Sequence, residues 1–368
     1  MKDYSIKFRR GCISLACFIL LGLSSCGVVS SENTIQVSWL DADGTIIERI
    51  NLSSEGDFKE RELPNDTDEW HYTNWKSVYS ENKIICVAQR VPIIKYFWLD
   101  DKGNTIKEAN NINDDEDNAP ELPISNEKWE YVGWEKSVAS NTVIYTANCL
   151  PNKEYFLGNV FQIVLNDEKG VPISTGSGFI IDEEGWFITN NHVMEGGASA
   201  IAYFDIEDAY SSSKYVHLSV AGCVYNSKEK DIFIGKLEGY DKLSNYYHDI
   251  DFIEEYQIGE KVYSIGYPNS SLYMKINKGV ILDEYLDIYN KINESYYILS
   301  DSYIAPGSSG GILINENFEV VGITSMGLYE DSYNQVYIAG GSIPTSLFSS
   351  CLNNLNELDL KLLTEIYN

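Results

Sequence analysis

Short apolar runs, many of them alternating with polar residues, recur along most of the chain. Alternation with a period of two is the pattern of a strand with one buried face. Eleven such runs follow residue 155, separated by turn residues: 160–165, 178–181, 186–189, 201–204, 216–220, 232–236, 261–265, 296–299, 311–314, 320–324 and 336–339. This texture predicts an all-β fold, either a sandwich or a pair of barrels, over residues 155–350.

A different spacing marks the end of the chain. Between residues 346 and 367, apolar residues recur at the intervals of one helix face, namely Leu347, Leu352, Leu355, Leu358 and Leu362. The pattern predicts a C-terminal helix. We assign residues 351–368 to a helical tail behind the β-rich region.

Residues 34–150 contain an internal repeat with an offset of 59 positions. WLDADG at 39–44 returns as WLDDKG at 98–103, and three aromatic pairs follow at the same offset: Trp70 with Trp129, Tyr72 with Tyr131, and Trp75 with Trp134. Matches along a whole unit indicate two tandem modules, 34–92 and 93–150. Each combines strand-like runs (36–40 and 84–89; 95–99 and 143–148) with an Asp/Gly turn.

The order of these features resembles the Listeria–Bacteroides-type repeats of bacterial surface proteins. That resemblance implies small β-grasp-like modules. Two roles are open for them: spacers that lift the C-terminal domain off a surface, or modules that bind a ligand or partner.

The N-terminus has the features of a secretory segment. Lys2, Lys7, Arg9 and Arg10 precede the apolar run 13–23, which is too short to span a bilayer comfortably. Leu23-Ser24-Ser25-Cys26 then resembles the lipobox of bacterial lipoproteins. The resemblance implies a signal peptide over 1–25, lipid on Cys26, and a membrane-anchored extracytoplasmic protein, periplasmic or surface-exposed. An ordinary signal peptide with an incidental Cys26, or an uncleaved anchor, is the alternative.

Charge and cysteine content narrow the function classes. The 368-residue chain has a formal net charge of -28, which disfavours binding to the phosphates of nucleic acids. Cys86, Cys149, Cys223 and Cys351 lie far apart without CxxC spacing, so we expect no metal site and no cofactor. One isolated disulfide stays open, and the sequence leaves the oligomeric state undetermined.

Three short motifs carry residues suited to nucleophilic catalysis. His192 ends a strand-like run in GSGFIIDEEGWFITNNHV, Asp231 opens DIFIGKL, and Ser309 lies in PGSSGG. A lone histidine at a strand end is more often structural, and an acid before a strand is more often a turn residue. A serine becomes a nucleophile only beside a base that takes its proton.

The three motifs together, in this order, resemble those of the trypsin-like serine peptidases, and within them the HtrA (Deg) branch. This resemblance implies a chymotrypsin-like double β-barrel and a catalytic triad of His192, Asp231 and Ser309. It also implies that the backbone N–H groups of Gly307 and Ser309 form the oxyanion hole. Ser308 stands where digestive trypsins carry Asp, so activation through a newly cut N-terminus is not supported.

The same resemblance sketches a substrate pocket and a function. Tyr303 would lie at the pocket base, and Ser325, Met326 and Gly327 would form one wall. Because no acidic side chain is expected at the bottom of this pocket, we expect the substrate to carry a small or medium apolar residue before the scissile bond. The sequence thus favours a lipid-anchored serine endopeptidase acting on proteins or peptides. The alternative is a catalytically idle binding or adhesion protein that uses the repeats and the cleft.

Overall fold

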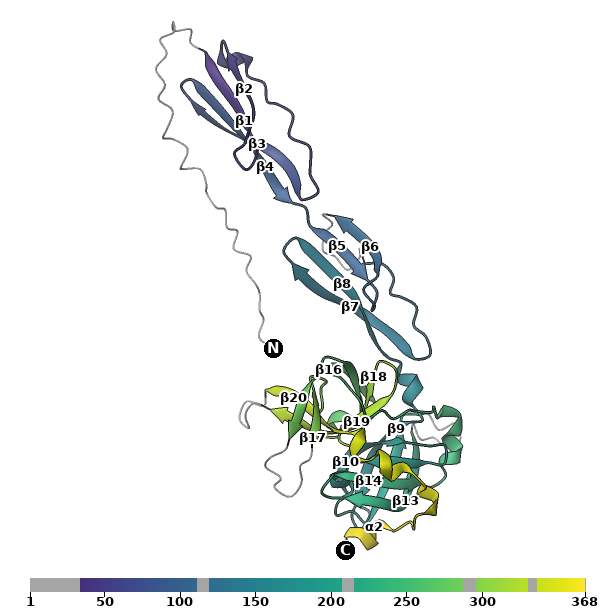
Figure 1. Cartoon of the computed structure of the whole chain (residues 1–368). Coiled ribbons are helices and arrows are strands. Elements are labelled where there is room, and N and C mark those ends of the chain that lie inside the picture. Colours follow the sequence, from purple (N-terminus) through teal and green to yellow (C-terminus); the bar gives the residue numbers. More distant parts are fainter. Residues whose placement is uncertain (1–33, 111–118, 207–214, 287–295, 330–335, 368) are drawn as a thin grey trace. The chain divides into compact units, whose positions relative to one another are not determined.

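The computed structural model describes residues 34–110, 119–206, 215–286, 296–329 and 336–367 (Figure 1). The predicted signal peptide and Cys26 lie outside these residues. The chain divides into two compact units, Met1–Lys95 and Tyr96–Asn368. Within the described ranges, none of the helices combines the length and apolarity needed to cross a membrane.

The first unit contains a four-stranded sheet in the order β2-β1-β4-β3. Its strands are β1 (Ile35–Leu40), β2 (Ile46–Leu52), β3 (Trp70–Ser80) and β4 (Lys83–Pro92). β1 pairs with β2 antiparallel and with β4 parallel. Alternate residues of these strands form the core, among them Val37, Trp39 and Trp75. The indole N–H of Trp75 donates to the Arg61 carbonyl at 2.8 Å, so this buried polar atom is paired.

The second unit begins with a sheet of the same order, β6-β5-β8-β7. Its strands are β5 (Lys95–Leu99), β6 (Thr105–Asn110), β7 (Trp129–Ala139) and β8 (Thr142–Pro151). Trp98, 1% exposed, stacks on Tyr145 with ring centroids 5.5 Å apart. The two stretches related by the sequence repeat therefore share one strand order.

A closed barrel follows, with the strand order β10-β11-β14-β13-β12-β9. Its strands are β9 (Val160–Asn166), β10 (Pro172–Ile180), β11 (Trp186–Thr189), β12 (Ser199–Phe204), β13 (Val216–Ser227) and β14 (Ile232–Leu237). Their inward residues include Phe161, Phe187, Phe204 and Phe233, all fully buried. The short helix α1 (Asn191–Met194) follows β11 directly.

A second closed barrel has the order β15-β16-β17-β20-β19-β18. Its strands are β15 (Lys261–Gly266), β16 (Lys275–Leu286), β17 (Tyr296–Ser300), β18 (Ile312–Asn315), β19 (Val320–Tyr329) and β20 (Tyr337–Pro344). The fold is thus all-β with two six-stranded barrels, as the sequence predicts. The eleven predicted runs each coincide with a barrel strand, whereas β16 was not predicted.

The predicted C-terminal helix is wrong over most of its length. The structure has 3₁₀ turns at Thr345–Leu347, Ser349–Leu352 and Leu355–Glu357, and only α2 (Leu363–Tyr367) is α-helical. Asn354 adopts a left-handed conformation with φ 56°, which ends any continuous helix there. Lys361 instead forms an isolated antiparallel bridge with Cys223 of β13. The leucine spacing arises from a segment that wraps over the first barrel.

Candidate active site

His192 and Asp231 are joined by two hydrogen bonds within the first barrel. The His192 backbone N–H donates to Asp231 Oδ1 at 2.9 Å, and ring Nδ1 lies 2.7 Å from Asp231 Oδ2. An ionised carboxylate only accepts, so Nδ1 carries the proton and Nε2 keeps its lone pair. The two bonds fix both the backbone and the ring of His192 against one carboxylate, which leaves Nε2 available as a base.

Asp231 occupies an unusual backbone conformation. Its φ is 55°, in the left-handed region that Asp tolerates better than most side chains. Its carbonyl accepts a hydrogen bond from the Asn190 side-chain amide at 3.0 Å, and its side chain is 19% exposed. The turn before β14 therefore holds the carboxylate in place at the cost of local backbone strain.

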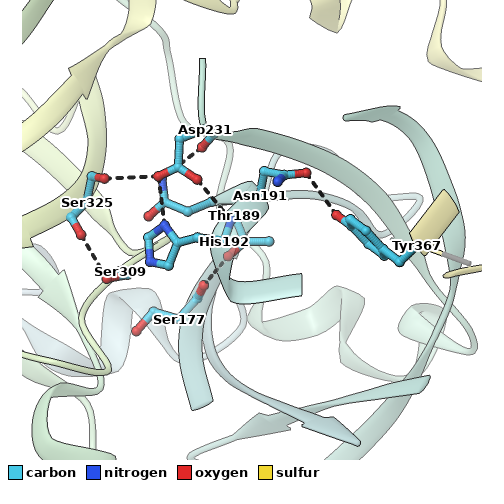
Figure 2. Close-up of polar contacts among 9 residues, drawn as sticks. Ser177, Thr189, Asn191, His192, Asp231, Ser309, Ser325 and Tyr367 are labelled. Carbon is cyan, nitrogen blue, oxygen red and sulfur yellow. Dashed lines mark hydrogen bonds and ion pairs between the residues drawn. The ribbon is translucent and has the colours of Figure 1, made fainter. Parts of the chain in front are cut away.

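Ser309 lies in the second barrel, in the loop between β17 and β18. Its hydroxyl donates to the Ser325 carbonyl at 2.8 Å, and the structure records no hydrogen bond between Ser309 Oγ and His192. Ser325 Oγ in turn donates to Asp231 Oδ2 at 3.2 Å, so one residue of β19 contacts both Ser309 and Asp231. In Figure 2 the His192 ring lies between Asp231 and Ser309.

The backbone before Ser309 forms a tight turn. The Ser308 N–H donates to the Ala305 carbonyl at 2.9 Å, and Gly307 has φ 95°, the conformation that the third position of a type II turn requires. Among the described residues, the N–H groups of Gly307 and Ser309 have no hydrogen-bond partner. An oxyanion hole needs two unpaired N–H groups of this kind beside the reacting serine.

The carbonyls of Pro306, Gly307 and Ser308 each accept a hydrogen bond from a donor in another segment. The Asn269 N–H donates to Pro306 at 2.6 Å, the Ser177 hydroxyl to Gly307 at 2.7 Å, and the Thr324 hydroxyl to Ser308 at 2.6 Å. In a trans peptide the C=O and N–H point in opposite directions. Bonds to the carbonyls of Pro306 and Ser308 therefore orient the N–H groups of Gly307 and Ser309 away from those donors.

Comparison with known proteins agrees with this geometry. Residues 176–323 match the profile of the trypsin-like peptidase domain, and this range includes His192, Asp231 and Ser309. The double barrel is a trypsin-like peptidase domain. Its motifs, its two closed barrels and its joined His192–Asp231 pair are three independent observations that lead to this assignment.

Curated relatives of the peptidase domain are HtrA-type proteases. The chain is 29% identical over 192 residues to a probable periplasmic serine endoprotease DegP-like of Hahella chejuensis, covering 50% of this chain and 36% of that protein. It is 29% identical over 163 residues to serine protease HTRA3 of Homo sapiens (43% and 34%) and 28% identical over 183 residues to serine protease Do-like HtrA of Bacillus subtilis (47% and 37%). The chain thus spans only about a third of these relatives.

Solved structures similar to the chain are also named as proteases. The HtrA-type protease AlgW with tripeptide aligns with a TM-score of 0.44 and 20% identity over 55% of this chain and 63% of that chain. A serine endoprotease from Yersinia pestis aligns with a TM-score of 0.42 and 21% identity over 55% and 66%.

The two glycines after Ser309 permit close approaches of neighbouring segments, Gly310 to the first barrel and Gly311 to β15 of its own barrel. A Cβ on Gly310 would lie 2.1 Å from both the Ser177 carbonyl oxygen and Thr189 Oγ1, and its φ is 85°. A Cβ on Gly311 would lie 2.4 Å from the Ile265 carbonyl oxygen. At both positions a side chain would collide with neighbouring segments of the fold.

Of the predicted pocket residues, Ser325 contacts Ser309 directly, whereas Tyr303 is not buried as a residue at the bottom of a pocket would be. Tyr303 is 42% exposed and packs on Tyr337, with ring centroids 5.1 Å apart. The buried Ile304 packs in this region instead: a Cβ on Gly340 would lie 2.5 Å from its Cδ1, and a Cβ on Gly327 would lie 2.7 Å from its backbone carbonyl oxygen. Gly327 and Met326 of β19 pair with Gly340 and Gly341 of β20.

Titratable groups near the domain core are shifted mainly by burial. Burial raises the pKa of the Tyr337 hydroxyl to about 12, and this hydroxyl donates to the Ser302 carbonyl at 2.5 Å. Burial also raises the pKa of the Cys223 thiol to about 12. Cys86, Cys149, Cys223 and Cys351 are free. Across the described ranges, no group of three or more His, Cys, Asp or Glu residues is arranged to hold a metal ion.

Several site residues were not found from the sequence. Ser177, Thr189, Asn190 and Thr324 have polar side chains within apolar strands or at their ends, and all four are buried. A buried hydroxyl or amide needs a hydrogen-bond partner. A polar residue within an apolar run is therefore the signal for such residues that is visible in the sequence. The partners themselves lie far away; Ser177 and Gly307 are separated by 130 positions. Ser325 was predicted as a pocket wall, and its contacts with Asp231 and Ser309 were missed.

Proposed function

We propose that this protein is a serine endopeptidase that hydrolyses peptide bonds through an acyl-enzyme on Ser309. The observation that carries the proposal is the bidentate contact between His192 and the Asp231 carboxylate, beside a turn in which the N–H groups of Gly307 and Ser309 are unpaired. Relatives that share the peptidase domain are named as serine proteases.

The roles follow from the geometry. Ser309 Oγ leaves the Ser325 carbonyl, gives its proton to His192 Nε2 and attacks the scissile carbonyl carbon. Asp231 stabilises the imidazolium, and the N–H groups of Gly307 and Ser309 bind the oxyanion. Collapse of the tetrahedral intermediate transfers the proton from His192 to the leaving amine. A water molecule, deprotonated by His192, then attacks the acyl-enzyme and releases Ser309.

A fluorophosphonate probe tests the nucleophile, because it reacts with an activated serine without needing a known substrate. We expect labelling of the wild-type protein and of Ser308→Ala, which removes only the neighbouring hydroxyl. Ser309→Ala and His192→Ala should show no labelling. If all four proteins stay unlabelled, the catalytically idle binding protein is the better reading. If Ser308→Ala alone loses labelling, the nucleophile is misassigned.

The proposed pocket favours small or medium apolar residues before the scissile bond. Ile304 is apolar and 1% exposed, and its side chain lies against Gly340, so we expect it to leave little depth for a long side chain. A peptide-library profile should therefore show Ala or Val at this position, and Ile304→Ala should extend the profile towards Leu and Phe. A profile dominated by Lys or Arg would contradict the pocket assignment.

We further propose that the protein is held at a membrane by lipid on Cys26, outside the cytoplasm. The support is the sequence Leu23-Ser24-Ser25-Cys26 after an apolar run, together with relatives named as periplasmic. Wild-type protein should fractionate with membranes and incorporate an alkyne fatty acid, whereas Cys26→Ser should lose the label. Equal labelling of both proteins would reject Cys26 as the acceptor.

A further inference from the structure

Residues 361–366, the segment before Tyr367, pack against the first barrel. The Cys223 N–H donates to the Lys361 carbonyl and the Lys361 N–H donates to the Cys223 carbonyl, both at 2.8 Å. A Cβ on Gly222 would lie 2.6 Å from the Lys361 carbonyl oxygen, so the segment lies directly on β13. Leu363, 4% exposed, packs in the core cluster of this barrel. The segment is therefore fixed by backbone pairing and by burial.

Tyr367 extends this segment to the residue next to His192. Its hydroxyl donates to Asn191 Oδ1 at 2.8 Å, and Asn191 is 2% exposed (Figure 2). Burial raises the pKa of the Tyr367 hydroxyl, and the nearby Cys223, Glu195 and Asp231 raise it further. The hydroxyl therefore keeps its proton and donates throughout the pH range in which a histidine base works.

Three side chains in a row anchor the backbone that leads into His192. Thr189 Oγ1 donates to the Ser177 carbonyl at 2.6 Å, the Asn190 amide donates to the Asp231 carbonyl at 3.0 Å, and Asn191 accepts from Tyr367. The His192 side chain itself is 47% exposed, so packing alone does not hold its ring. Its position depends on the Asp231 carboxylate and on these backbone anchors.

We propose that Tyr367 is a positioning residue for His192, acting through the Asn191 carboxamide. This inference rests on the proposed peptidase function. Removal of the hydroxyl leaves a buried amide oxygen without its donor, and the Asn191 side chain must then turn towards another partner. Because Asn191 and His192 share a peptide unit, that rearrangement moves the base relative to Ser309.

Tyr367→Phe removes only the hydroxyl, and Tyr240→Phe is its matched control. Tyr240 packs in the same core cluster, and its hydroxyl donates to the Gly158 carbonyl at 2.8 Å, away from α1. We expect Tyr367→Phe to lower kcat about tenfold with KM within a factor of about two, because misplacing a base costs rate rather than binding. We expect both variants to lower Tm by a similar amount, because each loses one hydroxyl hydrogen bond. Tyr240→Phe should nevertheless keep the wild-type kcat.

Nuclear magnetic resonance of ¹⁵N-histidine-labelled protein gives a readout that needs no activity. The His192 Nδ1 proton, assigned with His192→Ala, should shift or broaden in Tyr367→Phe and stay unchanged in Tyr240→Phe. If wild-type protein neither hydrolyses peptides nor reacts with the fluorophosphonate, the proposed function fails while this signal still tests the positioning. If Tyr367→Phe matches Tyr240→Phe in both kcat and the His192 signal, the inference is overturned.

Discussion

The hydroxyl of Ser177 in the first barrel donates a 2.7 Å hydrogen bond to the carbonyl of Gly307 in the second. Ser177 Oγ also accepts a hydrogen bond from the Tyr267 N–H at 2.9 Å. The Ser177 backbone N–H donates to the Ser309 carbonyl at 2.8 Å. Ser177 is fully buried, so water does not replace these bonds when they break. One strand of the first barrel thus fixes the loop that carries Ser309.

Ser177→Ala should impair catalysis more than folding. The substitution leaves the Gly307 carbonyl and the Tyr267 N–H unpaired, at a cost of about 1–3 kcal/mol each in a buried site. The turn would relax towards other partners and misalign the oxyanion donors. We expect kcat to fall by about 10- to 100-fold with little change in KM, measured on a peptide substrate. A fall in Tm with kcat preserved would show that Ser177 has a structural role only.

Thr324→Val tests the carbonyl on the other side of the oxyanion hole. Thr324 Oγ1 donates to the Ser308 carbonyl at 2.6 Å, and Thr345 Oγ1 makes the same type of bond to the Val320 carbonyl at 3.0 Å. Both threonines are 1% exposed, so the two valine variants have matched burial. Thr324→Val should slow fluorophosphonate labelling about tenfold or more, whereas Thr345→Val should label at the wild-type rate. Equal rates in the two variants would contradict the role of Thr324.

Asp182→Asn should stabilise the protein at neutral pH and have no effect in acid. Burial raises the pKa of Asp182 above its usual 3.8, against the opposing N–H bonds from Trp186 and Glu184. Between the unfolded and folded pKa values the native state binds more protons, so stability falls as pH rises through this window. Asn accepts the same two N–H bonds without acquiring charge.

The measurement for this prediction is Tm of both proteins at pH 3 and pH 7. The difference between variant and wild type should be near zero at pH 3 and positive at pH 7. Because all other groups titrate equally in both proteins, the difference isolates Asp182. A difference that is the same at both pH values would show that the charge of Asp182 is not its source.

The four cysteines should differ in their reactivity towards iodoacetamide according to their burial. Cys86, Cys149 and Cys223 are buried, and burial raises the pKa of each thiol, that of Cys149 to about 11. Cys351 is half-buried. Because the thiolate is the reactive form, brief iodoacetamide treatment at pH 8 should modify Cys351 first. Mass spectrometry of the digested protein identifies each site, and rapid native modification of Cys223 would contradict the packing of Lys361 on β13.

The sequence predicted the barrel strands where apolar runs were dense and failed where they were sparse. β16 was missed because Lys275, Asn277 and Lys278 interrupt its start and Asp283 with Glu284 its end. Pairing with β15 on one side and β17 on the other stabilises this polar sequence as a strand. The terminal helix was predicted from leucine spacing alone, which carries no information about the bridge between Lys361 and Cys223.

The triad candidates could be named because each lies in a short motif whose residues are adjacent in sequence. The anchors of the oxyanion turn could not, since Ser177, Thr324 and Asn269 meet it only after both barrels have closed. Their polarity in buried positions was visible, but their partners were a property of the folded chain. Ile304, rather than Tyr303, fills the pocket region for the same reason.

The pairing of Lys361 with Cys223 also determines an order of events during synthesis. The first barrel is translated before the second, yet Leu363 and Tyr367 complete its core and its contact with Asn191. A chain that lacks residues 361–367 keeps His192, Asp231 and Ser309 but lacks this support for His192. We expect such a chain, once released from the ribosome, to react slowly with the fluorophosphonate, so that the first barrel becomes competent only after a segment that follows the second barrel has folded onto it.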